Sequence, residues 1–267
     1  MADALVVDGI CVRLGDHVLL DDVSYAVARG EVVGLVGSSG SGKTLACRAA
    51  LGMVDLAPGV VAGTVTVSDG ARTHSPYDGL HGRGRRARDR AFRVLRGAVV
   101  GYAPQDAVGA LDPFARVGAQ VRGAARLAGR DADPVPWLLR AGFARPDAVR
   151  VAGCWPHQLS GGMAQRVVMA QSLARGSRFL LADEPTTGLD APLQLQVVAE
   201  LRGLADREGL GVVLVTHDLR MVRRFADRVV VMDRARVVET LTAAELAAGA
   251  AASDAGQALF AAALGAA

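Results

Sequence analysis

Eight residues near the start of the chain combine glycines, hydroxyl groups and a lysine at a spacing that suits a phosphate group. They are Gly37, Ser38, Ser39, Gly40, Ser41, Gly42, Lys43 and Thr44. The apolar run 32–36 before them predicts a strand, and residues 45–51 after them predict a helix. In such a unit the backbone N–H groups and the helix N-terminus face one anion. Lys43 would reach the β- and γ-phosphates of a nucleoside triphosphate, and the Thr44 hydroxyl would coordinate Mg²⁺.

The composition of the chain strengthens this interpretation of Lys43. Of the thirty basic residues, Lys43 is the only lysine. An ammonium is a compact point charge on a thin stem and can thread between phosphates, whereas the guanidinium of arginine is a planar fork. The alternative is a chance glycine- and serine-rich loop with a stray lysine. A single lysine placed at random among the basic positions would fall here only about one time in thirty.

A pair of acids follows a second apolar run. Residues 179–182 are apolar and end at Asp183 and Glu184. Ligands of parallel sheets gather at the C-terminal ends of strands, so Asp183 is the candidate ligand on the Mg²⁺ side. Glu184 would polarise a water in line with the γ-phosphate. The alternative is an acid pair that caps a helix in a turn.

A third candidate site opens a predicted helix that runs to Arg175. It begins at Leu159 with Ser160, Gly161 and Gly162. A serine and two glycines at a helix start expose N–H groups and a hydroxyl, which suits a second anion-binding surface. Taken alone, an ordinary N-cap serine with flexible glycines explains the same residues.

The elements around these sites predict an α/β fold. Alternating residues over 5–30 predict short antiparallel strands, and residues 63–67 predict a strand that ends at Asp69-Gly70. Residues 98–103 predict a further strand, and 106–175 read as an inserted helical subdomain.

Strands and helices then alternate to the end of the chain. Strands are predicted at 179–183, 212–215 and 229–232, and helices at 190–208 and 219–225. This alternation implies a parallel sheet covered on both faces. Thr242 and Glu245 form a capping box that opens an alanine-rich helix, and the last fifteen residues are expected to be weakly ordered.

Bulk properties exclude several classes of protein. The net charge of +3 does not argue for nucleic acid, and the three cysteines lie too far apart in sequence for a disulfide framework or a zinc site. No signal peptide and no run of eighteen apolar residues is found, so we expect a soluble, cytoplasmic chain. Residues 72–96 carry eight arginines. Without interleaved aromatic residues, they favour a solvated amphipathic helix over a nucleic-acid surface.

Six motifs in this order resemble those of the ATP-binding-cassette ATPases over residues 5–240. They are the phosphate loop 37–44, Gln105, the signature 159–165, Asp183 with Glu184, the segment 187–190, and His217. The resemblance implies a P-loop NTPase (RecA-like) parallel-sheet core with an N-terminal antiparallel β subdomain and an inserted helical subdomain. The division is an ATPase domain over 1–240 (core 1–105 and 176–240, helical subdomain 106–175) and a helical tail over 241–267.

The resemblance also implies ATP and Mg²⁺ as cofactors and a site shared by two subunits. Glu184 would be the general base, and His217 would contact the γ-phosphate. Gln105 would touch Mg²⁺ or the attacking water, with Thr44 and Asp183 as the other metal-side residues. Asp190 would lie at the dimer seam. The residues expected to contact the nucleotide of the partner are Ser160, Gly161, Gly162 and Gln165.

One expected feature is missing near the phosphate loop. Members of the family usually present an aromatic ring for adenine in the 13–17 region, but this chain has Leu14 there, with His17 nearby. An aliphatic side chain gives contact without π-stacking. We therefore expect modest discrimination between ATP and GTP.

Within the family, residues 155–166 and 105–113 resemble the peptide and nickel uptake branch. That resemblance implies a second ATPase subunit of the same or a related chain, two permease subunits, and an extracytoplasmic solute-binding protein that acts indirectly. The chain would lie at the cytoplasmic face of the inner membrane, with no direct contact to nucleic acid. The alternatives are a soluble cassette that regulates or handles nucleic acid, and a catalytically silent structural partner.

Overall fold

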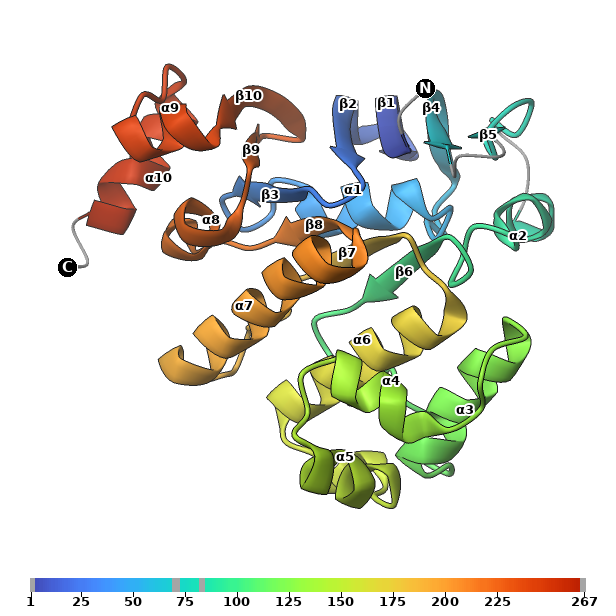
Figure 1. Cartoon of the computed structure of the whole chain (residues 1–267). Coiled ribbons are helices and arrows are strands. Elements are labelled where there is room, and N and C mark those ends of the chain that lie inside the picture. The colour runs from blue at the N-terminus through green and yellow to red at the C-terminus, as the bar shows by residue number, and fades with distance from the viewer. Residues whose placement is uncertain (1–2, 69–72, 82–84, 265–267) are drawn as a thin grey trace.

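The computed structural model describes residues 3–68, 73–81 and 85–264. Figure 1 shows a long antiparallel sheet above a second sheet, and a layer of helices below that. The second sheet has six strands in the order β10-β9-β3-β8-β7-β6. They are β3 (Val32–Gly37), β6 (Val100–Ala103), β7 (Phe179–Asp183), β8 (Gly211–Val215), β9 (Arg228–Asp233) and β10 (Arg236–Thr242). All neighbours pair in parallel except β9 and β10.

Alternate residues of the central strands enter two different cores. In β3, Val32 and Val36 pack with the helical layer, while Val33 and Leu35 pack toward the antiparallel sheet and α1 (Lys43–Ala50). The same alternation runs through β7 and β8. Both faces of these strands are therefore buried, which explains why their sequences are unbroken apolar runs. The predicted parallel sheet is confirmed.

The edge strand β10 was not predicted from the sequence. Only one of its seven residues, Leu241, is buried, so it lacks an apolar run. The turn before it is formed by Arg234 and Ala235, which both adopt positive φ without the glycine or asparagine that normally marks such a turn.

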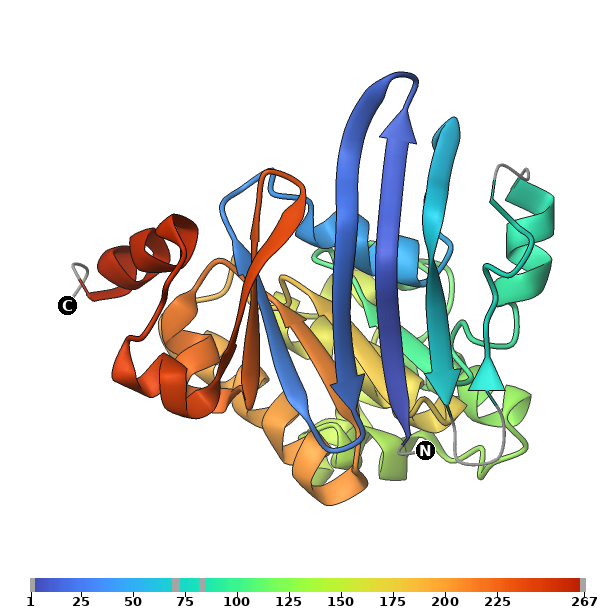
Figure 2. The ribbon, with the colours of Figure 1, turned by 90° about the horizontal axis from the view of Figure 1, so that it is seen from above.

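The antiparallel sheet has the order β2-β1-β4-β5, and Figure 2 shows its first three strands side by side. Its strands are β1 (Ala4–Leu14), β2 (His17–Ala28), β4 (Pro58–Ser68) and β5 (Thr73–His74). They are longer than the short strands we predicted, because Gly9 forms an irregularity within β1 instead of ending it. A Cβ on Gly63 would lie 2.4 Å from the backbone of Gly9, so the two glycines allow a close approach. The predicted strand end at Asp69-Gly70 lies outside the described residues.

Helices occupy the stretch between β6 and β7. They are α3 (Val117–Leu127), α4 (Pro134–Arg140), α5 (Arg145–Ala152), the 3₁₀ turn η1 (Pro156–Gln158) and α6 (Gly161–Arg175). Residues 104–178 are all described and contain no strand. After β7 come α7 (Ala191–Glu208), α8 (Leu219–Phe225), α9 (Ala243–Ala248) and α10 (Asp254–Leu264). The expectation of weak order in the last fifteen residues is wrong for 254–264, where α10 packs on α8. None of the helices among the described residues is long and apolar enough to cross a bilayer.

The arginine-rich stretch has a structural role that we did not predict. Its helix is α2 (Arg85–Phe92), and Arg72 and Arg83 lie outside the described residues. Arg88 is buried and donates to the carbonyl oxygen of Val54 at 2.8 Å. Arg96 donates to the carbonyl oxygens of Leu51 and Gly52 at 2.8 and 2.7 Å. These cations satisfy carbonyl groups at the C-terminal end of α1, where a positive charge also suits the helix dipole. We predicted a solvated amphipathic helix here, and the buried Arg88 differs from that prediction, whereas Arg96 lies beyond the end of the helix.

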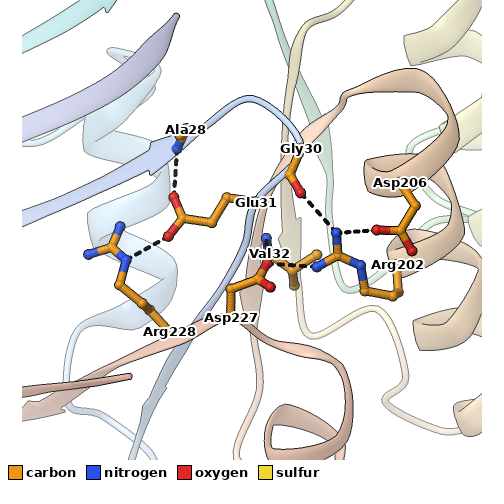
Figure 3. A network of polar contacts seen from close by, with 8 residues as sticks. All are labelled: Ala28, Gly30, Glu31, Val32, Arg202, Asp206, Asp227 and Arg228. Carbon is orange, nitrogen blue, oxygen red and sulfur yellow. Dashed lines mark hydrogen bonds and ion pairs between the residues drawn. The ribbon is translucent and has the colours of Figure 1, made fainter. Parts of the chain in front are cut away.

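A network of ion pairs fastens the N-terminal ends of β3 and β9 (Figure 3). Glu31 accepts from Ala28 N at 2.8 Å and from Arg228 at 2.6 Å. Arg202 of α7 donates to Asp227 at 2.7 Å and to the carbonyl oxygen of Gly30 at 2.8 Å. Asp227 in turn accepts from the N–H of Val32 at 2.8 Å. The network ties α7 to the beginning of the strand whose other end carries the phosphate loop.

Candidate functional site

The phosphate loop lies where β3 ends and α1 begins. Gly40 and Gly42 adopt φ of 81° and 103°, in the left-handed region that glycine occupies without a steric penalty. A Cβ on Gly42 would lie 2.6 Å from the side chain of Leu20 in β2. The loop therefore needs glycine at this position both for its backbone angle and for its contact with the antiparallel sheet.

Lys43 is folded back over this loop. The residue is 5% exposed, and its ammonium donates to the carbonyl oxygens of Gly37 and Ser38 at 2.9 and 2.8 Å. Burial lowers the pKa of Lys43, and the nearby carboxylates of Glu184 and Asp183 oppose that shift. The ammonium makes no ion pair with either acid at contact distance. It also donates to the Ser41 hydroxyl at 3.5 Å, and a cation held by carbonyl and hydroxyl dipoles suits an anionic ligand.

Asp183 stands at the C-terminal end of β7 and is 2% exposed. The Thr44 hydroxyl donates to its Oδ1 at 2.8 Å, and the Tyr102 hydroxyl donates to its Oδ2 at 2.8 Å. Burial, together with the charge of Asp183, raises the pKa of Tyr102 far above neutral pH, so the phenol keeps its proton. The structure thus brings together Thr44 and Asp183, as the sequence predicted, and adds Tyr102. No local sequence signal marks Tyr102, because its partner lies 81 residues away.

Glu184 lies in a strained turn directly after β7. Its φ of 47° is in the left-handed region, which costs a residue with a Cβ of the order of 1 kcal/mol. Its Oε2 accepts from the Thr187 hydroxyl at 2.9 Å, and its Oε1 lies 3.7 Å from Nδ1 of His217, the second residue after β8. The strained turn and the two neighbours fix the direction of this carboxylate.

A cavity of about 490 Å³ lies between the phosphate loop, Gln105 and Glu184. Its lining consists of Leu19, Ser39, Gly40, Gly42, Lys43, Thr44, Leu45, Arg48, Gln105 and Glu184. Gln105, which follows β6, therefore faces the phosphate loop. Arg48, one helical turn after Thr44, and Leu19 were not predicted to belong to the site. Leu14 does not line this cavity; it is 47% exposed at the end of β1, opposite His17.

Comparison with known proteins agrees with this arrangement. A family model described as ABC transporter matches residues 20–187. The chain is 36% identical over 246 residues to the dipeptide transport ATP-binding protein DppD of Escherichia coli, covering 88% of this chain and 71% of that protein. It is 37% identical over 229 residues to the nickel import ATP-binding protein NikD of Brucella suis, covering 84% and 79%. The chain belongs to the ABC transporter family.

The fold comparison gives the same result. The structure of cbiO1 from Clostridium perfringens, described as part of the ABC transporter complex cbiONQ, superposes with a TM-score of 0.73. The match covers 93% of this chain and 92% of that one at 23% sequence identity. The predicted P-loop fold is confirmed, and this ABC protein is an ATPase.

The signature residues of this ABC ATPase lie outside the phosphate-loop cavity. Ser160 is the N-cap of α6, and its hydroxyl accepts from the N–H of Met163 at 3.3 Å. Ser160 and Gly161 are exposed, whereas Gly162 is buried. None of these three residues lines the phosphate-loop cavity of the same chain.

Gln165 does not belong with the exposed signature residues. It is 3% exposed, and its amide donates to the carbonyl oxygen of Pro104 at 3.1 Å. A side chain held inside the subunit cannot reach a nucleotide on a partner, so our expectation for Gln165 is corrected. Its position one turn into α6 explains the difference, because that turn packs on the segment before Gln105.

Asp190 lies at the exposed start of α7. Its Oδ1 accepts from the N–H of Leu193 at 2.9 Å, which makes it the N-cap of that helix. An N-cap aspartate stabilises a helix by about 1 kcal/mol and has a second oxygen left for other contacts. Capping α7 therefore accounts for part of the role of Asp190. Its place at the seam between two subunits stays a prediction.

Proposed function

We propose that this ABC ATPase powers the uptake of a peptide, of nickel or of a metal chelate through separate permease subunits. The observation that carries the proposal is its 36–37% identity, over more than four fifths of the chain, to proteins named for dipeptide transport and nickel import. The enzyme would lie at the cytoplasmic face of the inner membrane, bound there through the permease. A solute-binding protein outside the membrane would select the cargo.

The phosphate-loop cavity is the proposed ATP site. Residues 37–44 would surround the triphosphate with N–H groups, and Lys43 would exchange its carbonyl partners for phosphate oxygens. A hydroxyl and a carboxylate from Thr44 and Asp183 are hard oxygen donors of the kind that Mg²⁺ prefers beside nucleotide phosphates, and Gln105 lies in the same cavity. When bound there, Mg²⁺ would neutralise negative charge on the β- and γ-phosphates.

We propose Glu184 as the general base. Its Oε2 is engaged by the Thr187 hydroxyl, so Oε1 is the oxygen left to accept the proton of the attacking water. His217, 3.7 Å from Oε1, would hold this geometry and donate toward the γ-phosphate. The strained backbone of Glu184 fixes the carboxylate before the nucleotide arrives.

The exposure of Ser160 and Gly161 at the start of the signature supports a second ATPase subunit that completes each site. We propose that Ser160, Gly161 and Gly162 face the γ-phosphate held by the partner, with Asp190 at the seam. The helical subdomain 106–175 would then move relative to the core when two subunits close on ATP. Gln105, at the junction of the two parts, would transmit this movement to the permease.

Reconstitution tests the proposal. The ATPase is combined in liposomes with each candidate permease pair, and its hydrolysis rate is measured with peptide, nickel or chelate supplied together with the binding protein. We expect one cargo class to stimulate hydrolysis, and Glu184→Gln in the same liposomes to abolish both hydrolysis and uptake. Recovery of the chain with ribosomes or DNA and without a permease would contradict an importer.

A further inference from the structure

Both oxygens of the Asp183 carboxylate are occupied by hydroxyl donors from different elements. Thr44 of α1 donates to Oδ1, and Tyr102 of β6 donates to Oδ2, each at 2.8 Å. The Thr44 contact belongs to the phosphate loop, but nothing in the proposed reaction uses Tyr102. An ionised carboxylate can only accept hydrogen bonds, so two donors on opposite oxygens fix its rotation about the Cβ–Cγ bond.

We propose that Tyr102 is a positioning residue for Asp183. Its hydroxyl anchors Oδ2 and thereby leaves Oδ1, beside the Thr44 hydroxyl, facing the phosphate loop. Hydrogen bonds to a metal-ligating carboxylate orient the ligand and influence metal affinity strongly. The inference rests on the proposed Mg²⁺ site, and it assigns to β6 a share in building that site.

Tyr102 can hold Asp183 because its own strand is fixed to the signature helix. A Cβ on Gly101 would lie 2.7 Å from the Ser172 hydroxyl, so the backbone of β6 lies directly against α6. Two residues after Tyr102, the carbonyl oxygen of Pro104 accepts from the buried amide of Gln165. The segment 101–104 is thus held at both ends by α6, and Tyr102 between them reaches across to β7.

This attachment joins the two functional surfaces of the chain. α6 is capped by Ser160 and carries Gln165 and Ser172. Tyr102 contacts the carboxylate of Asp183, the proposed metal-side residue of the same chain. Tyr102 is also among the residues that line a groove of about 460 Å³ between β6, α3 and α6. A shift of α6 against the sheet would therefore act on Asp183 through Tyr102.

The test compares nucleotide binding with and without metal. The affinity for a non-hydrolysable ATP analogue is measured by calorimetry in EDTA and in excess Mg²⁺, and the ratio of the two affinities gives the Mg²⁺ contribution. We expect Tyr102→Phe, which removes only the hydroxyl, to lower this ratio about tenfold. Its affinity in EDTA should equal that of the wild type, because the phosphate loop is untouched.

Tyr77→Phe is the matched control. Tyr77 is buried, whereas Tyr102 is half-buried, and the Tyr77 hydroxyl donates to a backbone carbonyl of α1, that of Ala49, at 2.6 Å without touching Asp183. This variant should lose thermal stability and keep the wild-type ratio. Tyr102→Met also fills the site without a hydroxyl. If one of the two variants folds poorly, the other still tests the inference, and both are expected to show the same lowered ratio of affinities.

The possible outcomes distinguish the role of Tyr102 from the proposed Mg²⁺ site on which it rests. A wild-type ratio well above one with an equal or higher ratio in Tyr102→Phe overturns the role of Tyr102 and leaves the Mg²⁺ site standing. A wild-type ratio of one refutes the Mg²⁺ site itself, and the positioning role with it. A lowered ratio in Tyr77→Phe would show that any lost hydroxyl near α1 has this effect, and it would also overturn the assignment.

Discussion

The two ends of the central sheet use charge in different ways. At the N-terminal ends of the strands, Glu31, Asp227, Arg202 and Arg228 form ion pairs with one another or with backbone groups of the adjoining turns (Figure 3). At the C-terminal ends, Lys43 is held by carbonyl oxygens and Asp183 by hydroxyl groups. The charges at the N-terminal ends neutralise one another within the chain, whereas Lys43 and Asp183 form no ion pair with each other.

The difference indicates what each end is for. The paired side chains at the N-terminal ends are partly exposed, with Arg202 at 20% and Asp227 at 51%, so they contribute to the fold through hydrogen bonds to backbone groups and to one another. A buried charge held only by dipoles is ready to exchange them for a ligand of opposite charge. Substitutions at the C-terminal end should therefore change chemistry more than stability, and substitutions at the N-terminal end should do the reverse.

The largest effect is expected for Glu184→Gln. Removing the proton acceptor should lower kcat for ATP hydrolysis by about 10²- to 10³-fold, while ATP still binds. Steady-state hydrolysis and the ATP-induced rise in Tm measure the two properties separately. Turnover equal to that of the wild type would remove Glu184 from the role of base.

Lys43→Ala should weaken binding of ATP by about ten- to a hundredfold, the loss expected when a charged hydrogen-bond donor to phosphate is removed. Calorimetry with a non-hydrolysable analogue measures the affinity. Lys43→Arg tests shape against charge, because a planar guanidinium does not fit between the loop carbonyls and phosphate as an ammonium does. Full affinity in Lys43→Arg would show that charge alone suffices here.

Arg202→Ala tests the opposite end of the sheet. Its side chain is 20% exposed and donates to Asp206, Asp227 and Gly30 O, so its loss should lower the free energy of unfolding by about 2 kcal/mol. Urea unfolding measures this change, and ATP affinity at a temperature where the variant is folded should match the wild type.

Arg207→Ala is the control in the same helix. Arg207 is 57% exposed and pairs with Glu200 on the surface, so its removal should cost less than about 1 kcal/mol. Equal losses in the two variants would mean that the network at the strand ends contributes no more than a surface pair.

The sequence predicts the elements that are buried on both sides and misses those that depend on distant partners. The bounds of β7 and α8 agree with the structure because an apolar run or a helical period defines each one. β10 was missed because Arg234 and Ala235 form its turn without glycine. No pattern within the sequence shows that Arg96 binds the end of α1, 44 residues earlier.

The same distinction holds in the candidate site. The phosphate loop is local, so its residues could be named from spacing alone. Tyr102 and Gln165 act through single contacts to Asp183 and Pro104, which are 81 and 61 residues away along the chain. A motif marks Gln165 as part of the signature, but only the packing of α6 on β6 shows that its side chain is turned inward.

The ion pair between Glu208 and Arg140 allows a pH-dependent test of how much a paired charge contributes to stability. It lies at the end of α7 and binds Arg140 of α4 in a two-pronged contact, and this hydrogen-bonded pairing lowers the pKa of Glu208. A carboxylate whose pKa is lowered in the folded chain stabilises it above the ordinary pKa of glutamate, and this contribution is lost as the pH falls through the lowered value. Glu208→Gln should reduce stability at neutral pH by less than about 1 kcal/mol, because solvent screens the pair.

Acid unfolding measures this contribution. The difference between wild type and Glu208→Gln should shrink as the pH falls below about 4.5 and vanish when Glu208 is protonated in the folded chain. A difference that does not depend on pH would assign the loss to packing and not to the charge of Glu208.

The smallest effect concerns the base of the nucleotide. Lys43 and Glu184 line the phosphate-loop cavity, whereas Leu14 is exposed at the end of β1, and the aliphatic residues on the cavity wall are Leu19 and Leu45. Aliphatic contact does not distinguish adenine from guanine by stacking or hydrogen bonds. Affinities for ATP and GTP, measured by competition, should therefore differ by less than about threefold, since such contacts supply well under 1 kcal/mol of discrimination. Leu14→Tyr should then raise ATP affinity if β1 lies beside the base. A hundredfold preference of the wild type for ATP would show that the site recognises the base as well as the phosphates.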